Sequence, residues 1–132
     1  MIKAAIAALD RWVRGEGAPP LTPRLEVIGT PPQFVLDDLG NVRGGIRSPA
    51  VDVPLAKLSG LGQTGRNFCA IFGTTVPFDT ATLATLYPEP QDYVDAVNAA
   101  TDRGVSGGFI LPADAALIKA GAEQFGAHCR EL

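Results

Sequence analysis

The spacing of hydrophobic residues at the start of the chain predicts an amphipathic helix over residues 2–14. Apolar side chains recur every three or four positions, and the charged residues fall largely elsewhere. The shared stripe consists of Ile2, Ile6, Leu9 and Val13. Gly15 and Gly17 end the helix, and the proline-rich stretch that follows is extended. Because Met1 cannot cap the first amides, we expect the element to begin outside this chain.

Short apolar runs in the middle of the chain, separated by turn residues, predict small strands. Residues 25–28 form one strand, and residues 34–36 and 42–47 form a hairpin around an Asp-Asp-Leu-Gly-Asn turn. Residues 51–58 are expected to be extended, and the proline among them holds the segment at a sheet edge. The glycine-rich stretch over 59–78 is too long for an unpacked connection, so we expect an ordered loop.

Capping and stop signals predict three helices in the last part of the chain. Asp79 caps the first, which ends before Pro88. Pro90 opens the second, Gly104 ends it, and Pro112 opens the third. Two stripes share helix faces: Tyr93, Val97 and Ala100, and then Ile118, Ala122 and Phe125. The predicted fold class is α+β: an N-terminal amphipathic helix, short antiparallel strands with a hairpin, an ordered glycine-rich loop and a helical C-terminal tail.

The composition is typical of one globular domain. The chain has 132 residues, 46% hydrophobic and 19% charged, with a net charge of −3. No apolar run approaches the roughly 20 residues of a membrane-spanning helix, and an acidic balance gives no electrostatic reason to bind nucleic acid. We therefore expect that the chain binds neither a membrane nor nucleic acid. We treat residues 1–132 as one segment, with a linker only at 15–24. The apolar run after Lys3 is too short for a signal peptide and leads into Asp10.

Several side chains are expected to have structural rather than chemical roles. The candidate core aromatics are Trp12, Phe68, Phe72, Phe78 and Tyr87. The arginines expected to be solvated are Arg43, Arg47 and Arg66, which would form an anion patch only if the fold gathers them. The acids assigned to turns and caps are Asp37, Asp38 and Asp52. Cys69 and Cys129 leave open one disulfide or two buried thiols. Since no Cys or His spacing suits a metal, we expect no metal and no cofactor.

One stretch matches a hydrolase signature without its structural context. Residues 104–108 fit G-x-S-x-G around Ser106, and Asp114 and His128 follow in the order of acid and base. A nucleophile elbow needs a strand before the serine and a helix after it, whereas the spacing here predicts a helix before it. We therefore expect a glycine turn between two helices, and a His128 that stabilises the end of the last helix.

A second stretch matches a dinucleotide-binding signature. Residues 60–65 fit G-x-G-x-x-G, in which the third glycine opens a helix whose amides face a pyrophosphate. Gly73 and Pro77 break the chain soon afterwards, and no second parallel strand follows. A structured loop is favoured, and a nucleotide site stays an alternative.

Four stretches carry a likeness to a known family. The most specific is DLGNVRGGIRSPAVDVP at 38–54. The others are ALDRWV at 8–13 with the prolines after it, FGTTVPF at 72–78 with the LYP that follows, and GFILPADA at 108–115. Together they resemble the C-terminal portion of the bacterial "alpha/beta hydrolase domain" proteins, which are longer, esterase-like serine hydrolases.

The resemblance implies a fragment of an α/β-hydrolase fold. Residues 2–14 are similar to the family's last core helix, and residues 25–132 to its C-terminal strands, loop and helices. The serine nucleophile and the histidine base would then lie upstream of Met1, so no catalytic residue is expected in this chain. The candidates for a wall of the substrate cleft are Phe68, Phe72 and Phe78.

Three functional hypotheses follow. In the first, the chain is the C-terminal segment of an ester hydrolase and binds a small ester only together with the missing N-terminal hydrolase core. In the second, it is a non-enzymatic interaction module whose partner chain covers the first helix. In the third, it is a small nucleotide-binding protein that uses Gly60–Gly65.

Overall fold

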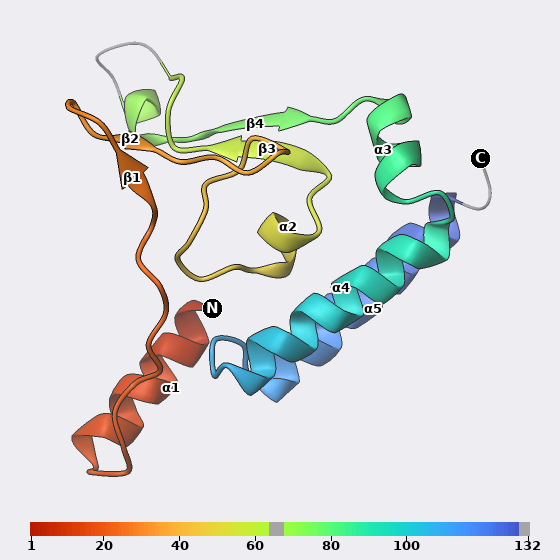
Figure 1. Ribbon diagram of the computed structural model, residues 1–132. Helices are drawn as coiled ribbons and strands as arrows, with labels where there is room; N and C mark the ends of the chain where they lie inside the picture. Colours follow the sequence, from red (N-terminus) through yellow and green to blue (C-terminus); the bar gives the residue numbers. More distant parts are fainter. Residues whose placement is uncertain (64–67, 130–132) are drawn as a thin grey trace.

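The computed structural model describes residues 1–63 and 68–129, which form the predicted α+β arrangement (Figure 1). In chain order the elements are α1 (Ile2–Val13), β1 (Val27–Ile28), β2 (Gln33–Phe34), α2 (Pro49–Asp52), β3 (Ala56–Ser59), the 3-10 turn η1 (Phe68–Ile71), β4 (Thr74–Pro77), α3 (Thr80–Leu86), α4 (Pro90–Ser106) and α5 (Pro112–Cys129). The described strands form two two-stranded antiparallel sheets. Among the described residues, no helix is both long and apolar enough to cross a membrane.

The first sheet leads into the turn that the sequence predicts. β1 pairs with β2, and an isolated antiparallel bridge joins Leu36 to Val42. Inside this bridge the Asp37 carboxylate accepts hydrogen bonds from the backbone N–H groups of Leu39 at 3.1 Å and Asn41 at 2.8 Å. A short acidic side chain that bonds the backbone just ahead of it favours such a turn. The predicted hairpin is confirmed, although its second arm bends after Val42 instead of continuing as a strand.

The second sheet differs from the sequence prediction. β3 and β4 pair from Ala56↔Pro77 to Ser59↔Thr74, so part of the stretch predicted as loop is a strand. The segment predicted as extended over 51–58 is helical at its start, because Pro49 begins the four-residue helix α2. Local patterns missed this pairing because strand stability depends on partners that are distant in sequence.

The helices α4 and α5 form a hairpin that contains most of the core (Figure 1). Val97 and Ala100 of α4 pack with Ala122 of α5 and with Val53, which follows α2. The N-terminus of α4 is closed by a reciprocal capping box between Glu89 and Asp92. The apolar faces predicted separately for these two helices pack against each other in this hairpin.

Gly104 does not end α4, contrary to the prediction. The helix continues to Ser106, and Gly107 is its C-cap. A Cβ at position 104 would lie 2.5 Å from Cδ1 of the buried Ile110. The glycine therefore lets the turn after α4 pack closely against the helix.

Helix α1 lies beside the turn between α4 and α5, and its far end extends away from the rest of the chain (Figure 1). Lys3 Nζ lies 2.7 Å from Asp114 Oδ1, in the first turn of α5. Ala4 and Ala8 are the buried residues of α1. The stretch after α1 returns along the helix, and its Pro20 lies near Gly108, where an added Cβ would be 3.4 Å from Pro20 Cγ, an ordinary contact distance. Small side chains thus form the contact between α1 and the rest.

Three of the five aromatics expected in the core are exposed. Trp12 is 57% exposed, Phe68 72% and Phe72 53%, whereas Phe78 and Tyr87 are half-buried. The buried apolar side chains are smaller ones: Ala4, Ala8, Val53, Val94, Val97, Ala100, Ile110, Ala115 and Ala122. The prediction assumed that large apolar groups find cover within the chain.

Candidate functional site

A cluster of charged side chains joins the hairpin turn, α2 and α4. Arg47 donates from Nε to Asp52 Oδ1 at 2.7 Å and from Nη2 to Asp37 Oδ2 at 3.1 Å. Its Nη1 donates to the carbonyl of Val42 at 2.9 Å, and Arg103 donates to Asp52 Oδ2 at 3.2 Å. The pKa of Arg47 is raised above its usual value, above all by the hydrogen bond to Asp52, against the opposing effect of burial.

The prediction that Arg47 is solvated is wrong. Its planar group is suited to several simultaneous hydrogen bonds, and its partners are carboxylates and carbonyls of this chain. The cluster is therefore a structural connection rather than an anion-binding site. Arg43 does stay exposed, in a 3.7 Å pair with Glu26, and Arg66 lies outside the described residues.

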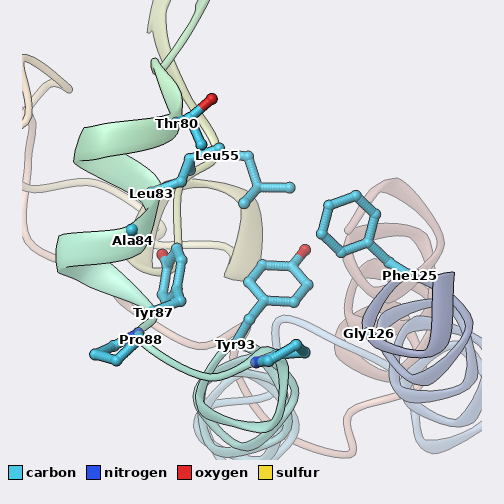
Figure 2. Close-up of a pocket in the computed structure, with 10 residues that line it drawn as sticks. Leu55, Thr80, Leu83, Ala84, Tyr87, Pro88, Tyr93, Phe125 and Gly126 are labelled. Carbon is cyan, nitrogen blue, oxygen red and sulfur yellow. The ribbon is translucent and has the colours of Figure 1, made fainter. Parts of the chain in front are cut away.

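An apolar pocket lies where α3, α4 and α5 meet the segment before β3 (Figure 2). We call it the tyrosine pocket, and its volume is ≈ 240 Å³. The ring of Tyr93 lies between the rings of Tyr87 and Phe125. The centroid of Tyr93 is 5.3 Å from that of Tyr87 and 5.2 Å from that of Phe125, and both contacts are edge-to-face. The remaining lining residues are Leu55, Thr80, Leu83, Ala84, Pro88, Pro90 and Gly126. These rings and aliphatic groups suit an apolar ligand group.

The chemistry of the tyrosine pocket is that of binding. Tyr87 donates from its hydroxyl to the carbonyl oxygen of Pro54 at 3.1 Å, and burial raises the pKa of its phenol. The phenol is therefore neutral at physiological pH. Among the described lining residues there is no histidine, cysteine or acid that could activate Thr80 as a nucleophile. The pocket can hold a neutral apolar group, but its described lining residues alone cannot start acyl transfer.

The sequence anticipates only part of this pocket. The sequence predicts one stripe with Tyr93 and another with Phe125, and the structure shows that these two stripes meet. No local signal in the sequence places Leu55 or the residues of α3 against those stripes. The direction of α3 relative to α4 depends on the turn at Pro88, which the sequence pattern does not specify. The pocket is a product of packing between elements that are separate in sequence.

A wider concavity lies between the two small sheets. We call it the strand groove, and its volume is ≈ 650 Å³. Its lining is Val27, Pro32, Gln33, Phe34, Leu36, Gly40, Val42, Lys57, Leu58, Ser59, Gly60 and Leu61. Asn41 joins its two sides, since its Oδ1 accepts a hydrogen bond from the N–H of Leu58 at 2.8 Å. The groove could not be predicted from the sequence, because this hydrogen bond joins residues 17 positions apart.

The geometry around Ser106 is not that of a nucleophile elbow. Ser106 ends α4, is exposed, and donates from Oγ to the carbonyl of Arg103 at 3.0 Å. Asp114 pairs with Lys3 instead of a histidine. The backbone of His128 lies in the last turn of α5, at the opposite end of that helix from Ser106, and its side chain lies outside the described residues. The predicted turn between two helices is confirmed.

The glycine stretch 60–65 is described only up to Gln63. Gln63 donates from Nε2 to the carbonyl of Gly73 at 3.2 Å, and Thr74 donates to the carbonyl of Leu61 at 2.9 Å. The next described element is the single 3-10 turn η1 rather than a long helix. The described part is a structured loop, as predicted, and lacks the helix that a pyrophosphate cradle requires.

The three cleft candidates do not gather in one place. Phe68 and Phe72 contact each other edge-to-face at 5.1 Å around η1. Phe78 lies after β4, where its N–H donates to the carbonyl of Leu55 at 3.0 Å. None of the three lines the tyrosine pocket or the strand groove. Their role in a substrate cleft stays a prediction.

The described residues show no group of three or more His, Cys, Asp or Glu side chains that could hold a metal ion. The side chains of Cys69 and Cys129 lie outside the described residues, so their pairing stays open. Asp37 and Asp52 serve a turn and the Arg47 cluster.

A comparison with protein-family models found one match, described as "Alpha/beta hydrolase domain", over residues 1–120. Comparisons with curated proteins and with solved structures gave no match.

Proposed function

The chain belongs to the alpha/beta hydrolase domain family, and on that basis we propose that it forms the C-terminal segment of a carboxylic-ester hydrolase. In serine hydrolases of this class, a serine oxygen attacks the ester carbonyl, the alcohol leaves, and water then releases the acid. The nucleophile and base belong to the N-terminal core of the domain. This segment completes the fold and contributes to the walls of the substrate cleft.

The uncovered apolar stripe of α1 carries the proposal. Its four large members, Ile2, Ile6, Leu9 and Val13, are between 51% and 79% exposed. Only Ala4 and Ala8 are buried on this helix. A 12-residue helix with an uncovered stripe is marginally stable in water. In α/β folds such stripes pack on a mostly parallel sheet, and the described strands supply only two short antiparallel pairs.

An ester assay on the purified chain tests the assignment of the catalytic groups. With p-nitrophenyl butyrate we expect no turnover above the buffer rate, and no difference between the wild-type chain and Ser106→Ala. Turnover that Ser106→Ala abolishes would contradict the proposal, because Ser106 would then be a nucleophile.

The cleft assignment is tested in a full-length member of the family. Alanine at the positions that match Phe72 and Phe78 is expected to raise KM for an ester with a long acyl chain more than for an acetate ester. Unchanged kinetics for both esters would remove these side chains from the cleft.

The same stripe favours a second function, a non-enzymatic interaction module. A partner chain that covers α1 would bury the same side chains as a hydrolase core. Mixing the chain with the N-terminal core of a family member separates the two functions. A hydrolase segment restores ester hydrolysis, and Leu9→Glu abolishes the restoration. An interaction module forms a complex that Leu9→Glu also disrupts, but no hydrolysis appears.

A further inference from the structure

The strand groove combines an apolar lining with one charged residue. Val27, Phe34 and Leu36 line it from the side of the first sheet, and Leu61 lines it beyond the end of β3. These side chains are apolar, and Lys57 is the only ionisable residue among those that line the groove. Its volume of ≈ 650 Å³ lies in the range of small-molecule sites.

The ammonium group of Lys57 makes no ion pair with any described residue. Glu26 and Asp37, which adjoin the lining residues Val27 and Leu36 in sequence, pair with Arg43 at 3.7 Å and with Arg47 at 3.1 Å. The aliphatic part of Lys57 lies against Gly40, where a Cβ would lie 3.0 Å from Lys57 Cδ and Cε. The chain of Lys57 is thus packed, while its positive charge is available.

Ser59 supplies a second polar donor to the same groove. Side chains two positions apart on a strand point to the same face, so Ser59 lies on the face of β3 that carries Lys57. Its Oγ accepts a hydrogen bond from the N–H of Leu61 at 3.0 Å. The hydroxyl proton is therefore free to be donated to a ligand.

We propose that the strand groove binds an amphipathic carboxylate. The hydrocarbon chain lies against Phe34 and Leu36, and the carboxylate lies between the Lys57 ammonium and the Ser59 hydroxyl. One cation and one neutral donor match a single negative charge, whereas a phosphate dianion would keep an unpaired charge at an apolar surface. The proposal rests on the groove alone and holds whether or not the chain takes part in ester hydrolysis.

Titration of the isotopically labelled chain with octanoate, followed by NMR, tests the site. Octanoate is expected to shift the amide signals of residues that line the groove and to leave those of α1 unchanged. Lys57→Met should weaken octanoate binding roughly fivefold, the most that an exposed ion pair usually contributes. Lys57→Arg should keep the affinity. The control Lys119→Met, which removes the pair with Asp102 on the helical hairpin, should have no effect.

Neutral and short ligands separate the two parts of the site. Octanol should bind more weakly than octanoate and be insensitive to Lys57→Met, and acetate should not bind. Equal octanoate binding to Lys57→Met and wild type would overturn the proposal, as would shifts spread over α1. A second copy or another protein segment is the occupant instead if the groove signals change with chain concentration and octanoate has no effect.

Discussion

The helical hairpin and α1 use their apolar residues in opposite ways. α4 buries Val94, Val97, Ala100, Thr101 and Gly104 against neighbouring elements of this chain. α1 buries two alanines and exposes Ile2, Ile6, Leu9 and Val13. Both helices are predicted from the spacing of their apolar residues, so the difference lies in which other elements pack against each helix. The hairpin carries its own partner, whereas no described element covers the large apolar side chains of α1; the proposed function assigns their cover to a hydrolase core.

The contrast separates a part of the molecule that buries its own apolar residues from one whose apolar stripe is exposed. A third kind of region, represented by the Arg47 cluster and the capped helix α3, is held by hydrogen bonds more than by apolar contacts. We therefore expect substitutions to lower the free energy of unfolding most in the hairpin, less in these hydrogen-bonded regions, and least in α1.

The largest effect is expected in the helical hairpin. Val97→Asp places an unpaired carboxylate among buried side chains and should lower the free energy of unfolding by about 4 kcal/mol. Ala99→Asp, two positions away on the exposed face of α4, should lower it by only about 1 kcal/mol or less, mainly through the lower helix propensity of Asp. Urea unfolding followed by far-UV circular dichroism measures both. Equal losses would mean that the hairpin is not a packed core.

The Arg47 cluster should give an intermediate effect. Arg47→Met leaves the carboxylates of Asp37 and Asp52, both largely buried, without their main cation. We expect a loss of about 2 kcal/mol, less than for a fully buried pair because water reaches these groups. Arg43→Met, in an exposed pair, should cost less than about 0.5 kcal/mol. An equal loss in the two variants would show that Arg47 is not the connection proposed for it.

Helix α3 has an N-terminal cap, Asp79, and no buried residues, so the contribution of the cap can be measured without that of core packing. Asp79 accepts a hydrogen bond from the N–H of Thr82 at 2.8 Å, and hydrogen bonds from Thr82 lower its pKa below 3.8. The contribution of this carboxylate to stability is complete above pH 3.8 and disappears as the pH falls through the lower folded-state pKa. Asp79→Ala should therefore melt at a lower temperature than wild type at pH 7, and the difference should vanish in strong acid. A difference that persists unchanged in strong acid would assign the loss to something other than the ionised cap.

The smallest effect is expected in α1. Leu9→Ala should change the free energy of unfolding by less than about 0.5 kcal/mol, because half of the side chain is already exposed. The same substitution should reduce the binding of a hydrophobic fluorescent dye, since it removes exposed apolar surface. A loss of about 2 kcal/mol in the isolated chain would show that the stripe is already covered and would remove the contrast with α4.

Much of the helical structure follows from local signals in the sequence. Asp79, Pro90 and Pro112 mark helix starts that the structure confirms, because caps and prolines act on their immediate neighbours. The apolar faces that carry Tyr93 and Phe125 also follow from spacing, whereas their contact with each other is known from the structure.

The candidate sites could not be predicted in the same way. The strand groove depends on Asn41 bonding to Leu58, and the tyrosine pocket depends on Leu55 meeting three helices. The exposure of Trp12 and Phe68 likewise depends on whether another element packs over them, and the spacing of apolar residues does not contain that information. The pattern shows which side chains favour burial, and the rest of the fold decides whether burial occurs.

The contacts of Arg47 also bear on the order in which the chain folds. Its bonds reach Asp37, ten positions before it, and Asp52, five positions after it, whereas the bond from Arg103 to Asp52 spans 51 positions. Contacts between near neighbours close quickly because little chain entropy is lost. During synthesis this stretch can therefore assemble on the ribosome before α4 has been translated, and the later helix then docks onto a structure that is already formed.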